Sequence, residues 1–196
     1  MVCVAALLSS GAVWAGQDWH LVKDEDGIEV YLKDVPGSSY QAYRGVVHIR
    51  SGVDRVLALQ DDPVQACTWI YECRQQKLLK SEQNRAWTYT QVNTPWPVQA
   101  RDTVLKIDTQ HQAGGVVLRE ISAEPTFMPA NAEYVRVPQA AGYWKLTPRD
   151  SGELEVIYEL HAEPGGSVPA WLANRFVVES PFQTLKQLRR LAEEQP

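Results

Sequence analysis

The C-terminal part of the chain contains the feature that most restricts its fold: one long amphipathic helix that follows a long series of strand-like segments. The helix is predicted over residues 169–192. Pro169 suits a first helical turn, and Pro181 should kink the helix near its middle. A helix with a single apolar stripe must bury that stripe against another layer of structure. The stripe consists of Trp171, Leu172, Phe176, Val177, Leu185, Leu188 and Leu191.

The layer beneath this helix is predicted from earlier residues, where apolar side chains mostly alternate instead of following a helical period. A turn at 24–27 separates strand-like segments 19–22 and 28–32, which predicts a hairpin. A third strand follows at 40–50. Further strands are predicted at 77–83, 86–92, 100–109, 116–123, 134–137, 142–147 and 154–162.

Two short helices are predicted between the third and fourth strands. Ser51 can cap a helix that starts near Val53, and Asp61-Asp62-Pro63 interrupts it. Residues 64–71 are predicted to form the second helix. This order indicates an α+β fold, in which helices pack on one face of a curved antiparallel sheet.

The length and charge of the chain limit the number of domains and the kinds of partner that we expect. With 196 residues, of which 44% are hydrophobic, it suits one domain, which we expect to span residues 17–194. A net charge of -5 gives no reason to expect nucleic acid or a strongly held anionic membrane as a partner. No segment approaches the ~20 apolar residues that a membrane-spanning helix needs.

Residues 1–15 differ from the rest of the chain and predict a signal peptide. They carry no charge, and an apolar run covers residues 2–8. Val13 and Ala15 fit the small-residue pattern before a signal-peptidase cleavage site. Export, with the periplasm as the expected compartment, follows from this interpretation. The alternative is a buried N-terminal segment of the domain.

Export leaves two cysteines, Cys67 and Cys73, in an oxidising compartment. If one unbroken helix contained both, a rise of ~1.5 Å per residue would separate their Cα atoms by roughly 9 Å, too far for a disulfide. A bond therefore requires the helix to end between them. The alternative is two buried thiols.

Known catalytic and cofactor patterns are missing from the sequence. His20, His48, His111 and His161 are scattered without metal-ligand spacing. No nucleophile elbow, zinc-protease motif, phosphate loop or dinucleotide fingerprint occurs. We therefore predict no metal, no cofactor and no catalytic residues.

Several short segments form an ordered set that covers nearly the whole expected domain. They are Asp26-Gly27-Ile28 with Val30-Tyr31, Trp69, Pro95-Trp96-Pro97-Val98 followed by Arg101-Asp102, Gly142-Tyr143-Trp144-Lys145-Leu146-Thr147-Pro148, and Pro164-Gly165-Gly166-Ser167-Val168-Pro169-Ala170-Trp171-Leu172-Ala173-Asn174. Each segment alone is a weak signal, whereas the set is specific. In these segments the chain resembles the START (StAR-related lipid transfer) domain family, in its exported bacterial form.

The resemblance implies a helix-grip fold, in which a bent antiparallel sheet surrounds the C-terminal helix and encloses a tunnel for one hydrophobic molecule. We therefore expect a monomer that binds, and carries, a lipid without catalysis, and that contacts a membrane transiently. Two alternatives stay open. One is a helix-grip enzyme, cyclase-like or hydrolase-like, that acts on a hydrophobic substrate. The other is a lipid-sensing module that reports to a partner protein.

Strand alternation selects the tunnel lining. In the segment that starts at Arg101, the set 101, 103, 105 and 107 is expected to point inward, and so is the set from Leu154 to Ala162. Arg101-Asp102 has an alternative role as a structural ion pair that fixes the loop at 94–98, which with the helix start would form a gate. The predicted lining residues are Trp96, Arg101, Thr103, Leu105, Trp144, Tyr158, Leu160, Trp171, Phe176 and Val177.

One position departs from some family members, which carry a second arginine six residues after the first. This chain has Ile107 there, so that polar anchor is absent. The tunnel is therefore predicted to be more apolar than in those relatives.

Overall fold

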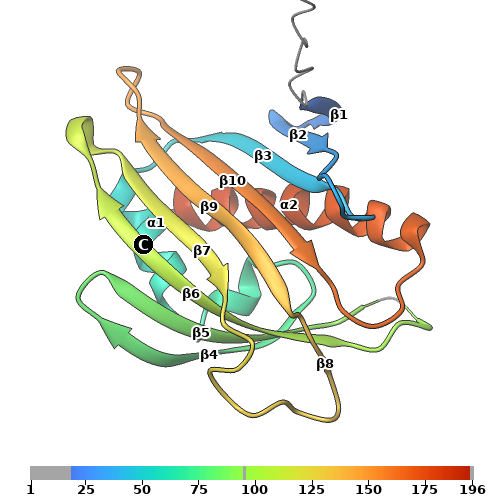
Figure 1. The fold of residues 1–196 in the computed structure, drawn as a ribbon. Coiled ribbons are helices and arrows are strands. Elements are labelled where there is room, and N and C mark those ends of the chain that lie inside the picture. The colour runs from blue at the N-terminus through green and yellow to red at the C-terminus, as the bar shows by residue number, and fades with distance from the viewer. Residues whose placement is uncertain (1–18, 95, 195–196) are drawn as a thin grey trace, which may run out of the picture.

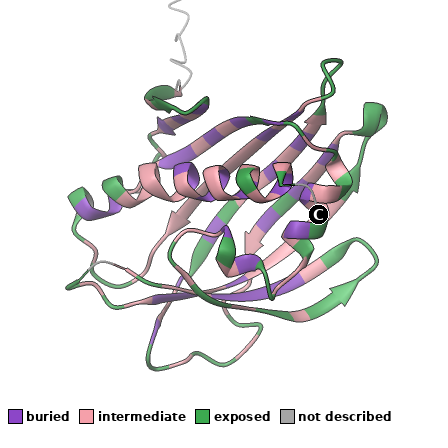
Figure 2. Ribbon diagram, turned by 180° about the vertical axis from the view of Figure 1, so that it is seen from behind, coloured by how far each residue is buried: buried purple, intermediate pink, exposed green. Residues whose placement is uncertain are grey.

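The structure is a computed structural model that describes residues 19–94 and 96–194. The predicted signal peptide lies outside these residues. Ten strands form one curved antiparallel sheet with a long helix, α2 (Ala170–Glu193), across its concave face (Figures 1 and 2). The predicted α+β helix-grip fold is therefore confirmed.

The strands follow one another along most of the chain. The first three precede helix α1 (Val53–Asp61), and the other seven lie between it and α2. The strands are β1 (His20–Glu25), β2 (Ile28–Lys33), β3 (Ala42–Ile49), β4 (Cys73–Glu82), β5 (Arg85–Val92), β6 (Arg101–His111), β7 (Val117–Ala123), β8 (Val135–Arg136), β9 (Gln139–Pro148) and β10 (Leu154–Glu163).

The sheet order is β1-β2-β3-β10-β9-β7-β6-β5-β4, and the short β8 pairs with β6 in parallel. The last strand, β10, thus joins the N-terminal hairpin to the rest of the sheet, with Val156 opposite Val47 on β3 and Leu146 on β9. Because α2 follows β10 directly, the chain returns over the sheet that it has just completed and packs on β3 and β2 (Figure 1).

The C-terminal half of α2 holds the hydrophobic core together. Phe182, Leu185 and Leu188 are fully buried and pack against β2, β3 and α1, where Val30 and Val47 are also inaccessible to solvent. Pro181 lies inside the helix without interrupting it. The kink expected at Pro181 thus does not divide α2 into two helices. None of the described helices is long and apolar enough to cross a membrane.

The second short helix predicted at 64–71 is wrong. Only one 3-10 turn, η1 (Ala66–Thr68), forms there, and β4 begins at Cys73. The physical reason is a reversal of the chain: Glu72 has φ 55°, and a disulfide joins Cys67 to Cys73 with their Cα atoms 4.8 Å apart. A smaller difference concerns α1, whose N-cap is Gly52 rather than Ser51.

Candidate functional site

A cavity of about 290 Å³ lies between the concave face of the sheet and the N-terminal half of α2. Its wall is mainly apolar, which suits a hydrophobic ligand. Alternate residues of the strands face it, as the pleat requires. They include Thr88, Thr90 and Val92 on β5, Arg101, Thr103, Leu105 and Ile107 on β6, and Tyr158, Leu160 and Ala162 on β10.

Stacked aromatic rings make one part of the wall. Trp144 on β9 lies parallel to Tyr158 on β10, with ring centroids 3.8 Å apart. Tyr43 meets Tyr158 edge-on at 5.2 Å, and Trp69 meets Trp144 edge-on at 6.1 Å. Burial raises the pKa of the Tyr43 and Tyr158 hydroxyls, so both rings stay neutral at physiological pH. This wall therefore offers a large apolar contact surface without charge.

The segment closed by the disulfide supplies another part of the wall. Trp69, Ile70 and Tyr71 line the cavity between Cys67 and Cys73. The Trp69 indole nitrogen donates a hydrogen bond to the Leu59 carbonyl at 3.2 Å, and the Tyr71 amide donates to the Thr184 hydroxyl at 3.1 Å. The bond between the two cysteines thus holds a short loop that is anchored to α1 and to α2.

Most residues predicted to line the tunnel meet around this one cavity. Their ligand contacts stay a prediction, because no ligand is bound. The residues brought together are Arg101, Thr103, Leu105, Trp144, Tyr158, Leu160, Phe176 and Val177.

Two predicted lining residues, Trp96 and Trp171, do not face the cavity. Trp96 is 91% exposed in the loop after β5, and Trp171 is 68% exposed in the first turn of α2. Leu172 and Phe176 are one helical turn apart and face the cavity, so Trp171 falls on the flank of that stripe. The spacing of apolar residues in α2 predicted Trp171 at the edge of the buried face. In the structure this edge is not covered, and the ring is in solvent.

Arg101 is the charged residue at one end of the cavity. Its side chain is 4% exposed, and it donates to the main-chain carbonyls of Gln99 and Gly165, the latter at 3.1 Å. Burial lowers the pKa of the Arg101 guanidinium. No carboxylate among the described residues forms an ion pair with it. The cavity therefore contains a buried positive charge with only neutral acceptors.

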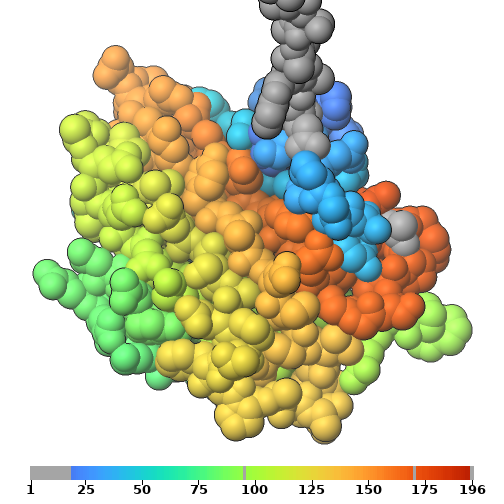
Figure 3. Space-filling view, viewed as in Figure 1, coloured from blue at the N-terminus to red at the C-terminus, as the bar shows by residue number. Residues whose placement is uncertain are grey.

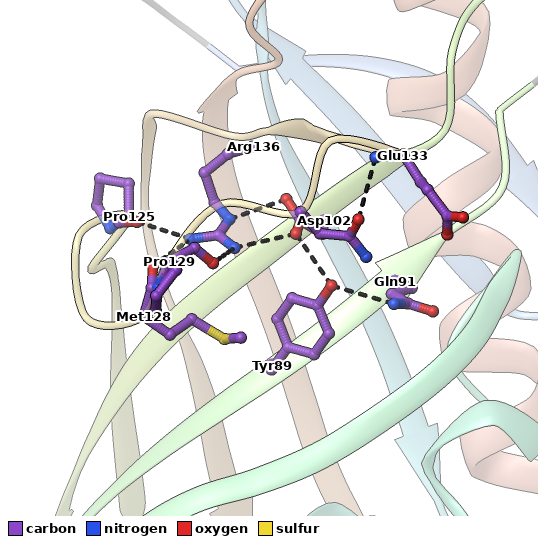
Figure 4. A network of polar contacts seen from close by, with 9 residues as sticks. Tyr89, Gln91, Asp102, Pro125, Met128, Pro129, Glu133 and Arg136 are labelled. Atoms are coloured by element: carbon purple, nitrogen blue, oxygen red, sulfur yellow. Dashed lines mark hydrogen bonds and ion pairs between the residues drawn. The ribbon is translucent and has the colours of Figure 1, made fainter.

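The neighbouring Asp102 points to the opposite face of the sheet. It accepts two hydrogen bonds from Arg136, at 2.8 and 3.0 Å, and one from the Tyr89 hydroxyl at 3.0 Å (Figure 4). Arg136 also donates to the carbonyls of Pro125 and Met128. The proposed Arg101-Asp102 ion pair is therefore wrong, because successive strand residues face opposite sides.

This outer network fixes a long loop on the sheet. The connection from β7 to β8, residues 124–134, spreads over the lower part of the outer face (Figure 3). Phe127 from this loop stacks on Trp87 of β5 with ring centroids 5.4 Å apart. The Asp102–Arg136 pair and this ring contact thus belong to the outside of the sheet, away from the cavity.

Arg119 on β7 also lines the cavity, at the level of Trp144, although it was not among the lining residues predicted from the sequence. Strand alternation could have found it, since Val117 and Ile121 flank Arg119 on the same buried face. Although residue 107 is an isoleucine, Arg119 therefore gives the cavity a second basic group besides Arg101.

The described residues contain no cluster of His, Cys, Asp and Glu that could hold a metal ion. The described lining instead combines apolar contact area with hydroxyl, amide and two guanidinium groups. Such a lining can bind and orient an amphiphilic molecule.

Comparison with known proteins identifies the family. The model of the START domain matches residues 1–196. The chain belongs to the START domain family. An uncharacterized protein of Pseudomonas aeruginosa is 47% identical over 192 residues, which are 98% of this chain and 95% of that protein.

Solved structures agree with this START assignment. A StAR-related lipid transfer protein from Xanthomonas axonopodis is 37% identical, with a TM-score of 0.84 over 90% of this chain and 99% of that one. Human StAR-related lipid transfer protein 5 has a TM-score of 0.80 over 89% and 86% of the two chains at 14% identity. A Streptomyces aromatase/cyclase shares the fold more distantly, with a TM-score of 0.54 at 14% identity over 78% and 93% of the chains.

Proposed function

We propose that this START domain binds one lipid in the cavity beneath α2 and carries it between membranes without chemical change. The observation that supports this function best is the mainly apolar cavity closed by the N-terminal half of α2. Each Å² of apolar ligand surface that enters such a cavity contributes about 25 cal/mol to binding. A lipid chain can therefore be held without any global charge attraction.

The polar part of the lipid would lie against Arg101. A buried guanidinium that pairs only with carbonyl groups is costly, and an acceptor oxygen of a ligand would offset part of that cost. Arg101 lies close to the start of α2, since it donates to Gly165. The polar group of the ligand would thus stay near the end of the cavity where the chain enters the helix.

The same end provides a route for lipid entry. Thr94 and Val98 from the loop after β5, and Val168 and Leu172 from the start of α2, line the cavity there. Opening of these two segments would release the ligand, as lids do in other proteins.

Contact with a membrane would occur at this entry route. Trp96 and Trp171 belong to the same two segments and expose their rings to solvent. Tryptophan is favoured at the membrane–water interface, because its ring is apolar and its N–H is polar. We infer that both rings enter the membrane surface while the lipid passes.

We further propose export to the periplasm. The Cys67–Cys73 disulfide is compatible with an oxidising compartment. The uncharged segment 1–15 supports export independently. Fractionation of host cells, followed by detection of the protein, tests this assignment.

The second candidate is an enzyme, because an aromatase/cyclase has the same fold. Fold alone does not decide between a carrier and an enzyme. Incubation with extracted host lipids separates the two: a carrier returns the lipid unchanged, whereas an enzyme yields a product of different mass.

Lipid binding is tested by native mass spectrometry of the full chain purified from its own host, followed by lipid extraction. We expect a bound mass of lipid size in the parent protein and its loss in Phe176→Ala, which removes a cavity-lining ring. Phe127→Ala is the matched control, since that ring lies on the outer face. A parent protein that is reproducibly free of lipid would overturn the proposal.

A further inference from the structure

Strand β8 lies between the two segments that border the proposed entry route. On one side it pairs with the start of β6, directly after the loop that follows β5. There the Val135 amide donates to the Ala100 carbonyl at 3.0 Å, and the Val137 amide donates to the Asp102 carbonyl at 2.9 Å. On the other side β8 meets the turn between β10 and α2, residues 164–169. This short strand therefore contacts both segments at once.

Two glycines bring the turn against β8. Gly165 and Gly166 have φ angles of 68° and 61°. A Cβ atom on Gly165 would be 3.1 Å from Cδ of Pro138, 3.2 Å from the carbonyl oxygen of Arg136 and 3.3 Å from Cγ1 of Val135. A Cβ atom on Gly166 would be 3.6 Å from the same Cγ1 atom. The backbone of the turn thus lies directly on β8 and on Pro138, and we call this contact the seam.

The two sides of β8 are held with unequal strength. On the β6 side, the backbone hydrogen bonds are joined on the outer face by the ion pair of Arg136 with the fully buried Asp102. On the turn side, no hydrogen bond joins β8 to the turn among the described residues. One hydrogen bond, from Arg101 to the Gly165 carbonyl at 3.1 Å, lies beside the seam. Two glycines also contribute few atoms to dispersion contacts. The seam is therefore the weaker side of β8 and should separate before β8 leaves β6.

The seam lies behind the wall of the cavity. Pro164 and Val168 of the turn line the cavity, and Val137 lines it from the other side of the seam. Val135 and Gly165, which form the seam, are not lining residues. Separation of the seam would therefore move one part of the wall away from another and open the cavity, without a change in the residues that touch the ligand.

We propose that the seam is the place where the entry route opens: the turn and the start of α2 move away together, while β8 stays paired with β6. Val135 and Gly165 are then positioning residues, which set how fast lipid enters and leaves but not how tightly it is bound. This inference rests on the proposed lipid binding and adds the contact that controls exchange of the lipid.

The test measures release and uptake of the lipid that the protein carries in its own host. The full chain is produced in that host on radioactive acetate, purified with its labelled lipid and mixed with phosphatidylcholine vesicles. The radioactivity that reaches the vesicles gives the release rate. Uptake is measured in the opposite direction, from vesicles of labelled host lipids to protein freed of lipid.

Gly165→Ala should raise both rates by about tenfold, which corresponds to about 1.4 kcal/mol. The new methyl group crowds the seam only while the seam is closed, so the variant favours opening. The lipid-free and the lipid-bound domain share the seam. The ratio of the two rates, and with it the affinity for lipid, should therefore stay at the parent value.

Gly152→Ala is the matched control. Gly152 has φ 81°, so alanine causes a similar backbone strain there, but nothing lies within 4 Å of a Cβ atom. Both variants should lose stability in urea denaturation, and only Gly165→Ala should exchange lipid faster. A general loss of stability would instead change the exchange rates of both variants alike.

A second variant tests the seam without backbone strain. Val135→Ala removes the side chain that both glycines face and keeps the backbone hydrogen bond to Ala100. It should also speed release and uptake, by a smaller factor. It takes the place of Gly165→Ala if that variant does not fold.

Hydrogen exchange shows which side of β8 moves. In the lipid-loaded parent, the amides of Val135 and Val137 should be protected longer than those of Leu172 and Ala173, which donate to the Pro169 carbonyl in the first turn of α2. Earlier exchange at Val135 and Val137 would show that β8 leaves β6 first, and would overturn the assignment of the seam.

The outcomes separate the seam from lipid binding itself. Parent rates in both Gly165→Ala and Val135→Ala, or equal acceleration in Gly152→Ala, overturn the seam as the point of opening and leave lipid binding intact. Lower affinity in place of faster exchange overturns the positioning role. A parent protein that is purified without lipid, and that takes up none from vesicles of host lipids, overturns both proposals.

Discussion

Gly45 of β3 lies directly against Leu185 of α2: a Cβ atom on Gly45 would be 2.5 Å from the Leu185 Cδ1 atom and 3.3 Å from Cβ of Pro181. The absence of a side chain at residue 45 therefore lets the helix approach the sheet closely. Because Leu185 is fully buried, it has little room to move aside. This contact sets the distance between the two layers that enclose the cavity.

Gly45→Ser should accordingly destabilise the domain by about 1–3 kcal/mol, since overpacking forces the helix or the Leu185 rotamer to shift. Urea denaturation measures the loss. Gly52→Ser is the matched control: nothing lies within 4 Å of a Cβ there, and serine is a good N-cap for α1. Equal stability of both variants would contradict the close approach.

The exposed tryptophans should affect lipid transfer and not lipid affinity. In Trp96→Ala/Trp171→Ala the cavity wall is intact, because neither ring faces it. We expect transfer between vesicles to slow by about tenfold or more, as loss of only 1.4 kcal/mol of membrane interaction has that effect. Phe127→Ala, which removes a partly exposed ring elsewhere, should transfer at the parent rate. Reduced lipid affinity in the double variant would place these rings at the ligand instead.

The disulfide should stabilise the cavity wall. Cys67→Ser/Cys73→Ser should lower the free energy of unfolding by roughly 2 kcal/mol, the value expected from closing a short loop. Lipid affinity should fall as well, since Trp69, Ile70 and Tyr71 lie in that loop. Thermal melts with and without dithiothreitol provide the measurement. Dithiothreitol should lower the melting temperature of the parent protein and leave that of the double variant unchanged. A lower melting temperature in both proteins would show that the reductant does not act through this disulfide.

The Asp102–Arg136 pair should be costly to break on one side only. Asp102 is fully buried, so Arg136→Met leaves an uncompensated carboxylate and should cost about 3–5 kcal/mol. The double variant Asp102→Leu/Arg136→Met removes both charges and should recover part of that loss. Chemical denaturation of both proteins measures the two losses of stability. Equal losses would show that the uncompensated Asp102 charge does not cause the cost.

The α+β class and the order of most elements were predictable from local patterns in the sequence, whereas the helix-grip fold was implied by the resemblance to START domains. Apolar side chains recur at every second position in the strands and at every third or fourth position in α2, and these spacings set which residues face the core. The turn at Asp26-Gly27, where both residues have positive φ, was recognisable from its residue types. The inward set from Arg101 to Ile107 follows from the same alternation and was predicted correctly as a strand face.

What failed depended on contacts that the local pattern of residues does not show. The helix expected at 64–71 is replaced by a turn, because the Cys67–Cys73 bond and the start of β4 outweigh local helical preference. The pairing of Asp102 with Arg136, 34 residues later, reflects the approach of β8 to β6. A short strand of two residues gives no periodic signal, so this approach could not be read from the chain.

The sequence by itself thus determined most of the elements, their order and the two faces of the longer strands, since these follow from nearest-neighbour geometry. Only the tertiary structure decided which edge of the α2 stripe stays in solvent, as Trp171 does, and which distant partners meet Arg101 and Arg119 in the cavity. The physical reason is that burial and charge compensation are properties of the closed space between layers. That space exists only after β10 and α2 have joined both halves of the sheet.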